Sequence, residues 1–355
     1  MKDRRSIQEL MDYLQTVEER ELQFEKDAII AAFESNNNQS LVIKVLSIFG
    51  GLLASVAFLV FLYGIGLYDS ALGVVFFGIV CLLGAIWLNK ISEKIIIDTV
   101  SVSFYIIGFV LLALGLGKLE MNENTICVLF MAISVISLLT TRNFILSFIA
   151  VLVLNGSVLT LILLNNNYDL IHLYVSVLAL ILTYVFLKEA RILTLNVALS
   201  KLYGPSRVGL LFSFLFGLIV LGKGIIPLSL DYIWISSFIF ISVIIYLISC
   251  IIKVIEVATV QQKVGIFIFS VLLLLSTIFS PAITGAILII LLSFMVNYRF
   301  GFGIGIISFV YFLSQYYYDL NFTLLTKSIL LFSTGVLFII LYFFTYKKLA
   351  PNEKV

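Results

Sequence analysis

The polar residues that could take part in chemistry gather near the C-terminal end of the chain. The run Gln315-Tyr316-Tyr317-Tyr318-Asp319 places an amide, three phenols and a carboxylate side by side, and Lys327 follows in the next apolar run. A lysine inside an apolar helix is costly unless it pairs with a polar group, although its stem can also snorkel to the interface. Hydrogen bonds and charge from such groups can bind a small solute or an ion. The predicted polar site comprises Lys327, Asp319, Gln315, Tyr317 and Tyr318.

Two further polar residues fall inside apolar runs. Asn155 lies near the middle of the run 144–164, where its amide must find a partner. It either holds two helices together or lines a pathway, and we include it in the candidate site. His172 lies near the start of the run 170–187, where an interfacial, hydrogen-bonded role and a proton relay are both open.

No catalytic motif accompanies these residues. The chain has a single histidine and lacks an HExxH, a GxSxG or any paired metal ligands, so we expect no enzyme, no metal ion and no cofactor. The glycines of Gly301-Phe302-Gly303-Ile304-Gly305 lack the strand that a phosphate loop needs. We expect Gly301 and Gly305 to allow close contact between helices instead.

The surrounding chain is strongly apolar. Of 355 residues, 62% are hydrophobic and 12% are charged, which leaves too little polar surface for soluble domains. We therefore predict an all-α polytopic membrane bundle of about 12 transmembrane helices. The turn at Ser280-Pro281 leaves open whether 264–297 spans fully or re-enters from one face. The predicted spans are 43–66, 71–88, 95–117, 125–141, 144–164, 170–187, 208–222, 232–252, 264–279, 282–297, 302–318 and 322–345.

The basic residues determine the predicted orientation. With an even number of spans, every Lys and Arg except Lys118, Lys223 and Lys327 falls on the side of both termini. The positive-inside rule makes that side the cytoplasm of a bacterial cytoplasmic (inner) membrane, crossed many times. Tyr-Asp pairs on the opposite joins are typical of an aromatic belt, and a ring of acids that attracts a cation is the alternative.

Polar segments divide the chain into domains. The first 40 residues contain nine acidic and five basic residues, so a helix there is expected to dock on a protein partner or a second copy rather than on anionic lipid. A second cytoplasmic helix is expected to end at Gly204-Pro205 and to separate two halves of about six spans each. The predicted domains are the N-terminal helix and linker 1–40, membrane half 41–187, linker helix 188–207, membrane half 208–346 and cytoplasmic tail 347–355.

The tail carries the most distinctive pattern. Gln315-Tyr316-Tyr317-Tyr318-Asp319-Leu320, followed by Thr323-Leu324-Leu325-Thr326-Lys327-Ser328 and Gly335, resembles the C-terminal part of a bacterial membrane family, domain of unknown function 4401 (DUF4401). The resemblance extends from about residue 40 to the end. It implies a polytopic inner-membrane protein without an assigned activity, and it supplies no catalytic residues.

These features favour a transporter or permease-like protein for a small solute or ion, with a cavity near Lys327, Asn155 and the Tyr/Asp cluster. The alternative is a non-transporting membrane scaffold or sensor subunit whose acidic N-terminal helix binds a partner. A lipid-modifying enzyme fits less well, because only the outer Asp and Tyr residues and His172 could supply acid or base chemistry. The net charge of +2 gives no indication of nucleic acid binding.

Overall fold

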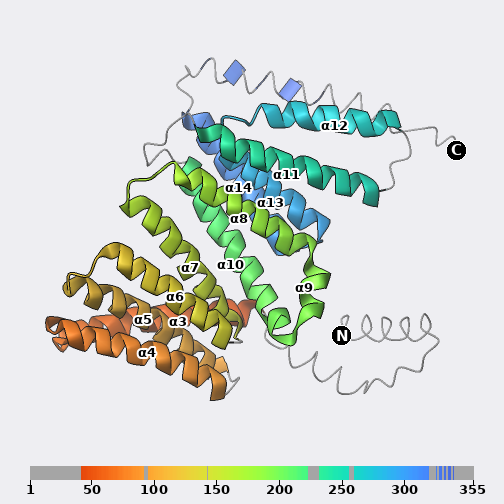
Figure 1. Ribbon diagram of the computed structural model, residues 1–355. Coiled ribbons are helices and arrows are strands. Elements are labelled where there is room, and N and C mark those ends of the chain that lie inside the picture. Colours follow the sequence, from red (N-terminus) through yellow and green to blue (C-terminus); the bar gives the residue numbers. More distant parts are fainter. Residues whose placement is uncertain are drawn as a thin grey trace, which may run out of the picture. The chain divides into compact units, whose positions relative to one another are not determined.

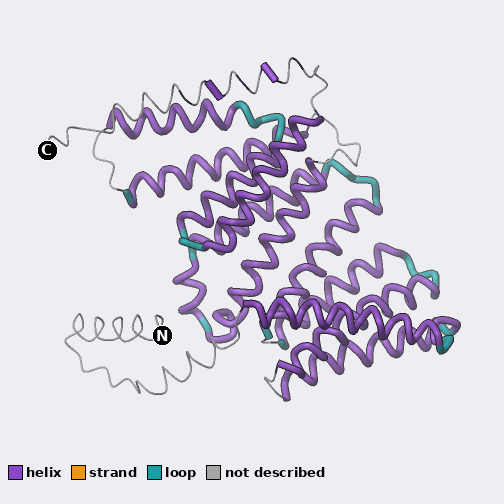
Figure 2. The backbone as a smooth tube through the Cα atoms, turned by 180° about the vertical axis from the view of Figure 1, so that it is seen from behind, coloured by secondary structure: helices purple, strands orange, loops and turns teal. Residues whose placement is uncertain are grey.

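All regular structure in the described part of the chain is helical. The structure, a computed structural model, describes residues 41–91, 95–141, 143–222, 232–255 and 260–319, together with single helical positions between 325 and 339 (Figure 1). Within these residues twelve α-helices and one 3-10 turn occur and no strand does (Figure 2). The all-α prediction is confirmed. The predicted N-terminal helix, most of the span 322–345 and the tail 347–355 lie outside the described residues.

Each predicted run from 43–66 to 302–318 coincides with one helix. By length and composition, eight of the helices could cross a membrane, namely α4, α5, α6, α7, α8, α10, α11 and α14. The apolar part of α3 and the helices α12 and α13 are shorter. A count of about 12 spans and a division into two halves of six remain predictions.

The chain folds into two compact units, and residues 1–121 form the first. Its elements are α3 (Leu41–Gly64), the 3-10 turn η1 (Leu67–Asp69), α4 (Ala71–Ile91) and α5 (Ile95–Lys118). Two serines join α3 to α5, because Ser103 Oγ donates to Gly51 O at 3.1 Å and Ser55 Oγ donates to Ser103 O at 3.2 Å. Because each hydroxyl donates to a backbone carbonyl, the serine side chains have hydrogen-bond partners within the apolar bundle.

Glycines bring α4 and α5 into close contact. A Cβ atom added to Gly115 would lie 2.9 Å from the backbone nitrogen of Val75, and one on Gly108 would lie 3.0 Å from Gly78 O. Such distances leave no room for a side chain, so the two backbones approach as only small residues permit.

The second unit, residues 122–355, contains the remaining described helices. Asn122 and Asn143 cap the first two of them by accepting hydrogen bonds from backbone N–H groups of the first turn. The core lies between α8, α10, α11 and α13, where Phe186, Phe214 and Phe240 are fully buried. The helices are α6 (Glu123–Thr140), α7 (Phe144–Leu164), α8 (Leu170–Leu187), α9 (Glu189–Leu195), α10 (Val197–Gly222), α11 (Ile233–Val254), α12 (Val260–Leu275), α13 (Pro281–Met295) and α14 (Arg299–Asp319).

One predicted boundary is wrong. The sequence predicts that a helix ends at Gly204-Pro205, whereas α10 continues through Pro205 to Gly222. Gly204 precedes the proline ring without a Cβ atom to collide with it, and Pro205 itself is buried. Tertiary packing of this segment therefore outweighs the local tendency of proline to end a helix.

The predicted glycine contact of α14 is present. A Cβ atom on Gly305 would lie 2.8 Å from Ile290 Cγ1 and 3.1 Å from the backbone nitrogen of Ile290 in α13. The absence of a side chain at this position lets α14 pack directly on the backbone of α13.

Candidate functional site: a polar pocket at one end of α10, α13 and α14

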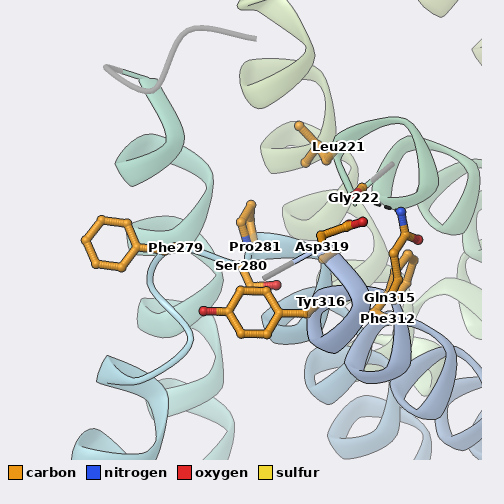
Figure 3. Close-up of a pocket in the computed structure, with 10 residues that line it drawn as sticks. Leu221, Gly222, Phe279, Ser280, Pro281, Phe312, Gln315, Tyr316 and Asp319 are labelled. Carbon is orange, nitrogen blue, oxygen red and sulfur yellow. Dashed lines mark hydrogen bonds between the residues drawn. The ribbon is translucent and has the colours of Figure 1, made fainter. Parts of the chain in front are cut away.

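A small pocket of about 100 Å³ lies where α10 and α14 approach the start of α13 (Figure 3). A space of this size suits an ion or a very small solute and is below that of drug-sized ligand sites. Pro281 occupies the first position of α13, and Ser280 precedes it without making a capping hydrogen bond through its side chain. The Ser280 hydroxyl is therefore available to a ligand. The lining residues are Leu221, Gly222, Phe279, Ser280, Pro281, Ala282, Phe312, Gln315, Tyr316 and Asp319.

The face of α14 that lines the pocket follows from helical spacing. Phe312, Gln315, Tyr316 and Asp319 occupy positions i, i+3, i+4 and i+7, which lie on one side of an α-helix. The same spacing places Tyr317 and Tyr318 away from the pocket, where their rings contact each other at a centroid distance of 5.7 Å. In Figure 3 the Phe279 ring points away from the other labelled side chains.

A hydrogen bond joins the ends of α14 and α10 at the pocket. Gln315 Nε2 donates to Gly222 O at 3.1 Å, drawn as a dashed line in Figure 3. Because a carbonyl only accepts, this bond orients the amide and leaves Gln315 Oε1 buried without a partner in the described part of the chain. A Cβ atom on Gly222 would lie 3.3 Å from Ala282 Cβ and 3.4 Å from Phe312 Cδ1, so the three helices meet closely here.

The electrostatics of the pocket favour a positive ligand. Asp319 is the single charged residue among those that line it. Phe312 and Tyr316 offer aromatic rings, whose faces also attract cations.

The predicted site residues are only partly brought together. The pocket contains Gln315 and Asp319, and it adds Phe312 and Tyr316, which the helical spacing of α14 could have indicated. Lys327 lies outside the described residues, so its predicted pairing remains a prediction.

Asn155 does not reach the pocket. Its Nδ2 donates to Val151 O of its own helix at 2.8 Å, and its backbone carbonyl accepts from the Tyr174 hydroxyl at 3.3 Å. The contact from α7 to α8 is thus made by the backbone of Asn155 and not by its amide. Sequence reasoning also missed the lining residues outside α14, because no pattern in the sequence shows that these segments meet α14; they are Leu221, Gly222, Phe279, Ser280, Pro281 and Ala282.

His172 is buried between α8 and α11, where its Nδ1 lies 2.9 Å from Ser236 Oγ. The expected hydrogen bond is present, and the depth of the ring relative to the membrane interface remains a prediction. Within the described residues no group of three or more His, Cys, Asp or Glu side chains could hold a metal ion.

The long apolar helices define the class of protein. Large apolar side chains such as Leu139, Trp234 and Phe238 are exposed on them, as expected for surfaces that face lipid. The chain is therefore a helical membrane protein. The family model described as Domain of unknown function (DUF4401) matches residues 40–348, and the chain belongs to this family. No curated protein and no solved structure matches it.

Proposed function

We propose that the protein is a transporter or permease-like protein for a small solute or ion, and that the pocket at the ends of α10, α13 and α14 binds this ligand. The observation that supports the proposal is the pocket itself, which combines a carboxylate, hydroxyls and aromatic rings at one end of three apolar helices. Gln315 Oε1 beside it is buried without a partner among the described residues, so a ligand that donates a hydrogen bond would satisfy it.

The side chains narrow the ligand to a small cation. Asp319 supplies the charge, Tyr316 and Ser280 supply hydroxyl oxygens, and none of the described residues that line the pocket is a lysine or an arginine. A monovalent ion or a small ammonium compound would pair with the carboxylate and lie against the rings of Phe312 and Tyr316. The proposed setting is the bacterial cytoplasmic membrane, with the pocket on the face opposite both termini.

Uptake into proteoliposomes tests the proposal. The probes are rubidium, ammonium and tetramethylammonium, with empty liposomes as the blank. Asp319→Asn should reduce uptake of the transported probe by about tenfold or more, since a charge-assisted contact contributes about 1.5–3 kcal/mol. Asp69→Asn is the matched control, because Asp69 also follows a tyrosine in a predicted outer join but does not line the pocket.

Two results would contradict the proposal: uptake of every probe equal to that of empty liposomes, or equal uptake by Asp319→Asn and the unmodified protein.

A membrane scaffold is the second candidate function, and the polar residues of α7 favour it. Asn155, Ser157 and Thr160 each donate a hydrogen bond to a carbonyl four residues earlier in the same helix, so these bonds serve their own helix. In this case the acidic segment 1–40, which lies outside the described residues, would bind a partner or a second copy. Light scattering in detergent tests self-association: a mass that halves on deletion of residues 1–38 supports it, and an unchanged mass contradicts it.

A further inference from the structure

Arg207 gathers several elements at the opposite end of the helices that form the pocket. It lies in α10 at about 22 Å along the helix from Gly222, by the rise of 1.5 Å per residue. Its Nη1 lies 3.4 Å from Glu189 Oε1 of α9 and donates to the Tyr203 hydroxyl at 3.2 Å. The Arg207 side chain is 17% exposed, so the charge is largely withdrawn from solvent.

Aromatic rings surround the same guanidinium. Arg207 Cζ lies 4.0 Å from the ring centroid of Tyr298, 5.0 Å from that of Tyr203 and 5.8 Å from that of Phe186. Tyr298 belongs to the turn between α13 and α14, and Phe186 belongs to α8. The Arg207 guanidinium therefore contacts residues of α8, α9 and α10 and the turn between α13 and α14.

Two polar atoms at this cluster have no partner. Arg207 Nε and Ser293 Oγ are buried and make no hydrogen bond in the described part of the chain. Ser293 lies next to Tyr298: a Cβ atom at Gly301 would lie 2.5 Å from Ser293 Oγ and 2.6 Å from Tyr298 Cδ1. Ser293 is therefore a buried position close to Tyr298, where a change in the packing of Tyr298 can be detected.

We propose that Arg207, Glu189 and Tyr298 form a latch that closes the end of the α10, α13 and α14 group opposite the pocket. This inference rests on the proposed transport function. With the pocket open at one end and the latch closed at the other, the structure represents one state of an alternating-access cycle. Release of the latch frees the α13–α14 turn from α10 and admits water beside Ser293.

The chemistry of the contacts suits a reversible closure. The Glu189 side chain is 33% exposed, so water can hydrate its carboxylate when it separates from Arg207, and each cation–π contact is individually weak. Interdigitated apolar side chains, such as Phe214 against Phe240 in the core, would have to expose their surface to water or leave a void. Separation of α10 from the α13–α14 turn at the latch therefore costs less free energy than separation of the packed apolar side chains.

The test measures access to Ser293 without any solute. In a background where Cys81, Cys127 and Cys250 are replaced by Ala, Ser293→Cys is exposed to a membrane-impermeant maleimide in inside-out and right-side-out vesicles. Glu189→Gln and Tyr298→Leu should each raise the labelling rate about tenfold, which corresponds to about 1.4 kcal/mol, and only in one vesicle orientation. Tyr311→Leu, an aromatic residue of α14 outside the latch, is the matched control and should leave the rate unchanged.

A second reporter separates release of the latch from general loosening. Ser134→Cys places a thiol at a fully buried position of α6, away from Arg207. Labelling of Ser134→Cys that rises in step with Ser293→Cys would overturn the latch, as would equal Ser293→Cys labelling with and without the latch substitutions.

Flux separates this inference from the function it rests on. Latch-dependent labelling in a protein without flux would overturn transport and keep a gated conformational change. Flux without latch-dependent labelling would overturn the latch alone.

Discussion

His172 and Ser236 form a hydrogen bond that joins α8 to α11. His172 Nδ1 lies 2.9 Å from Ser236 Oγ, which also lies 3.1 Å from Ile233 O of its own helix. His172 Nε2 is buried without a partner among the described residues. Many other hydroxyls, such as those of Ser176 and Thr183, donate instead to a carbonyl of their own helix.

Ser236→Ala should destabilise the protein by about 1–3 kcal/mol, because it leaves His172 Nδ1 buried without its hydrogen-bond partner. The measurement is the thermal midpoint in detergent. Ser242→Ala on the same helix is the control, since Ser242 is exposed and donates only to Phe238 O of α11. Equal midpoints for the two variants would show that the contact between α8 and α11 contributes nothing to stability.

At the scale of helices, close contact is achieved at positions without a side chain. In the α4–α5 pair the close neighbours include backbone atoms, namely Gly78 O beside Gly108 and the Val75 nitrogen beside Gly115, which cannot rotate away as a side chain can. In the α13–α14 pair Gly305 does the same beside Ile290. These pairs pack by the fit of their backbones, because lipid supplies no hydrophobic driving force between apolar helices.

Gly115→Ala should lower the thermal midpoint in detergent, at a cost of about 1–3 kcal/mol for overpacking. The added methyl group would lie 2.6 Å from Val75 Cγ2 and 2.9 Å from the Val75 nitrogen. Gly117→Ala in the same helix is the matched control, because nothing lies within 4 Å of its Cβ position. A midpoint for Gly115→Ala as high as that of Gly117→Ala would mean that α4 and α5 are not in direct backbone contact.

At the scale of the whole molecule, the pocket and the latch occupy opposite ends of the same three helices. The positive-inside rule assigns the latch end, with Lys188, Arg191 and Arg299 nearby in the chain, to the cytoplasm. The pocket would then face the outside. This orientation is a prediction from charge alone.

Reporter fusions test that orientation. A fusion after Thr194, between α8 and α10, and one after Lys348 should both report a cytoplasmic position, whereas a fusion after Glu120 should report the opposite side. Opposite readings at Met1 and Val355 would require an odd number of spans and would contradict the predicted topology. The Arg207 latch would then need to be assigned to a side by its own labelling result.

Hydropathy determined where the helices lie, from 43–66 to 302–318, because a bilayer demands long uninterrupted apolar runs and polar joins between them. The exception is Pro205, where a local signal for a helix end was overridden by burial in the folded unit. Composition also singled out Gln315 and Asp319 as candidate site residues. Their neighbours Phe312 and Tyr316 follow from helical periodicity once the helix is known.

Only the tertiary structure shows which residues Gln315 and Arg207 contact. The partner of Gln315 is Gly222, 93 residues earlier in the chain, and Arg207 of α10 is enclosed by residues of α8 and of the α13–α14 turn. A single apolar sequence specifies which segments enter the membrane but not which helix packs on which, because nearly all apolar faces are equivalent in lipid. Packing at glycines and a few hydrogen bonds selects the neighbours, and the pocket and the latch exist only where those neighbours meet.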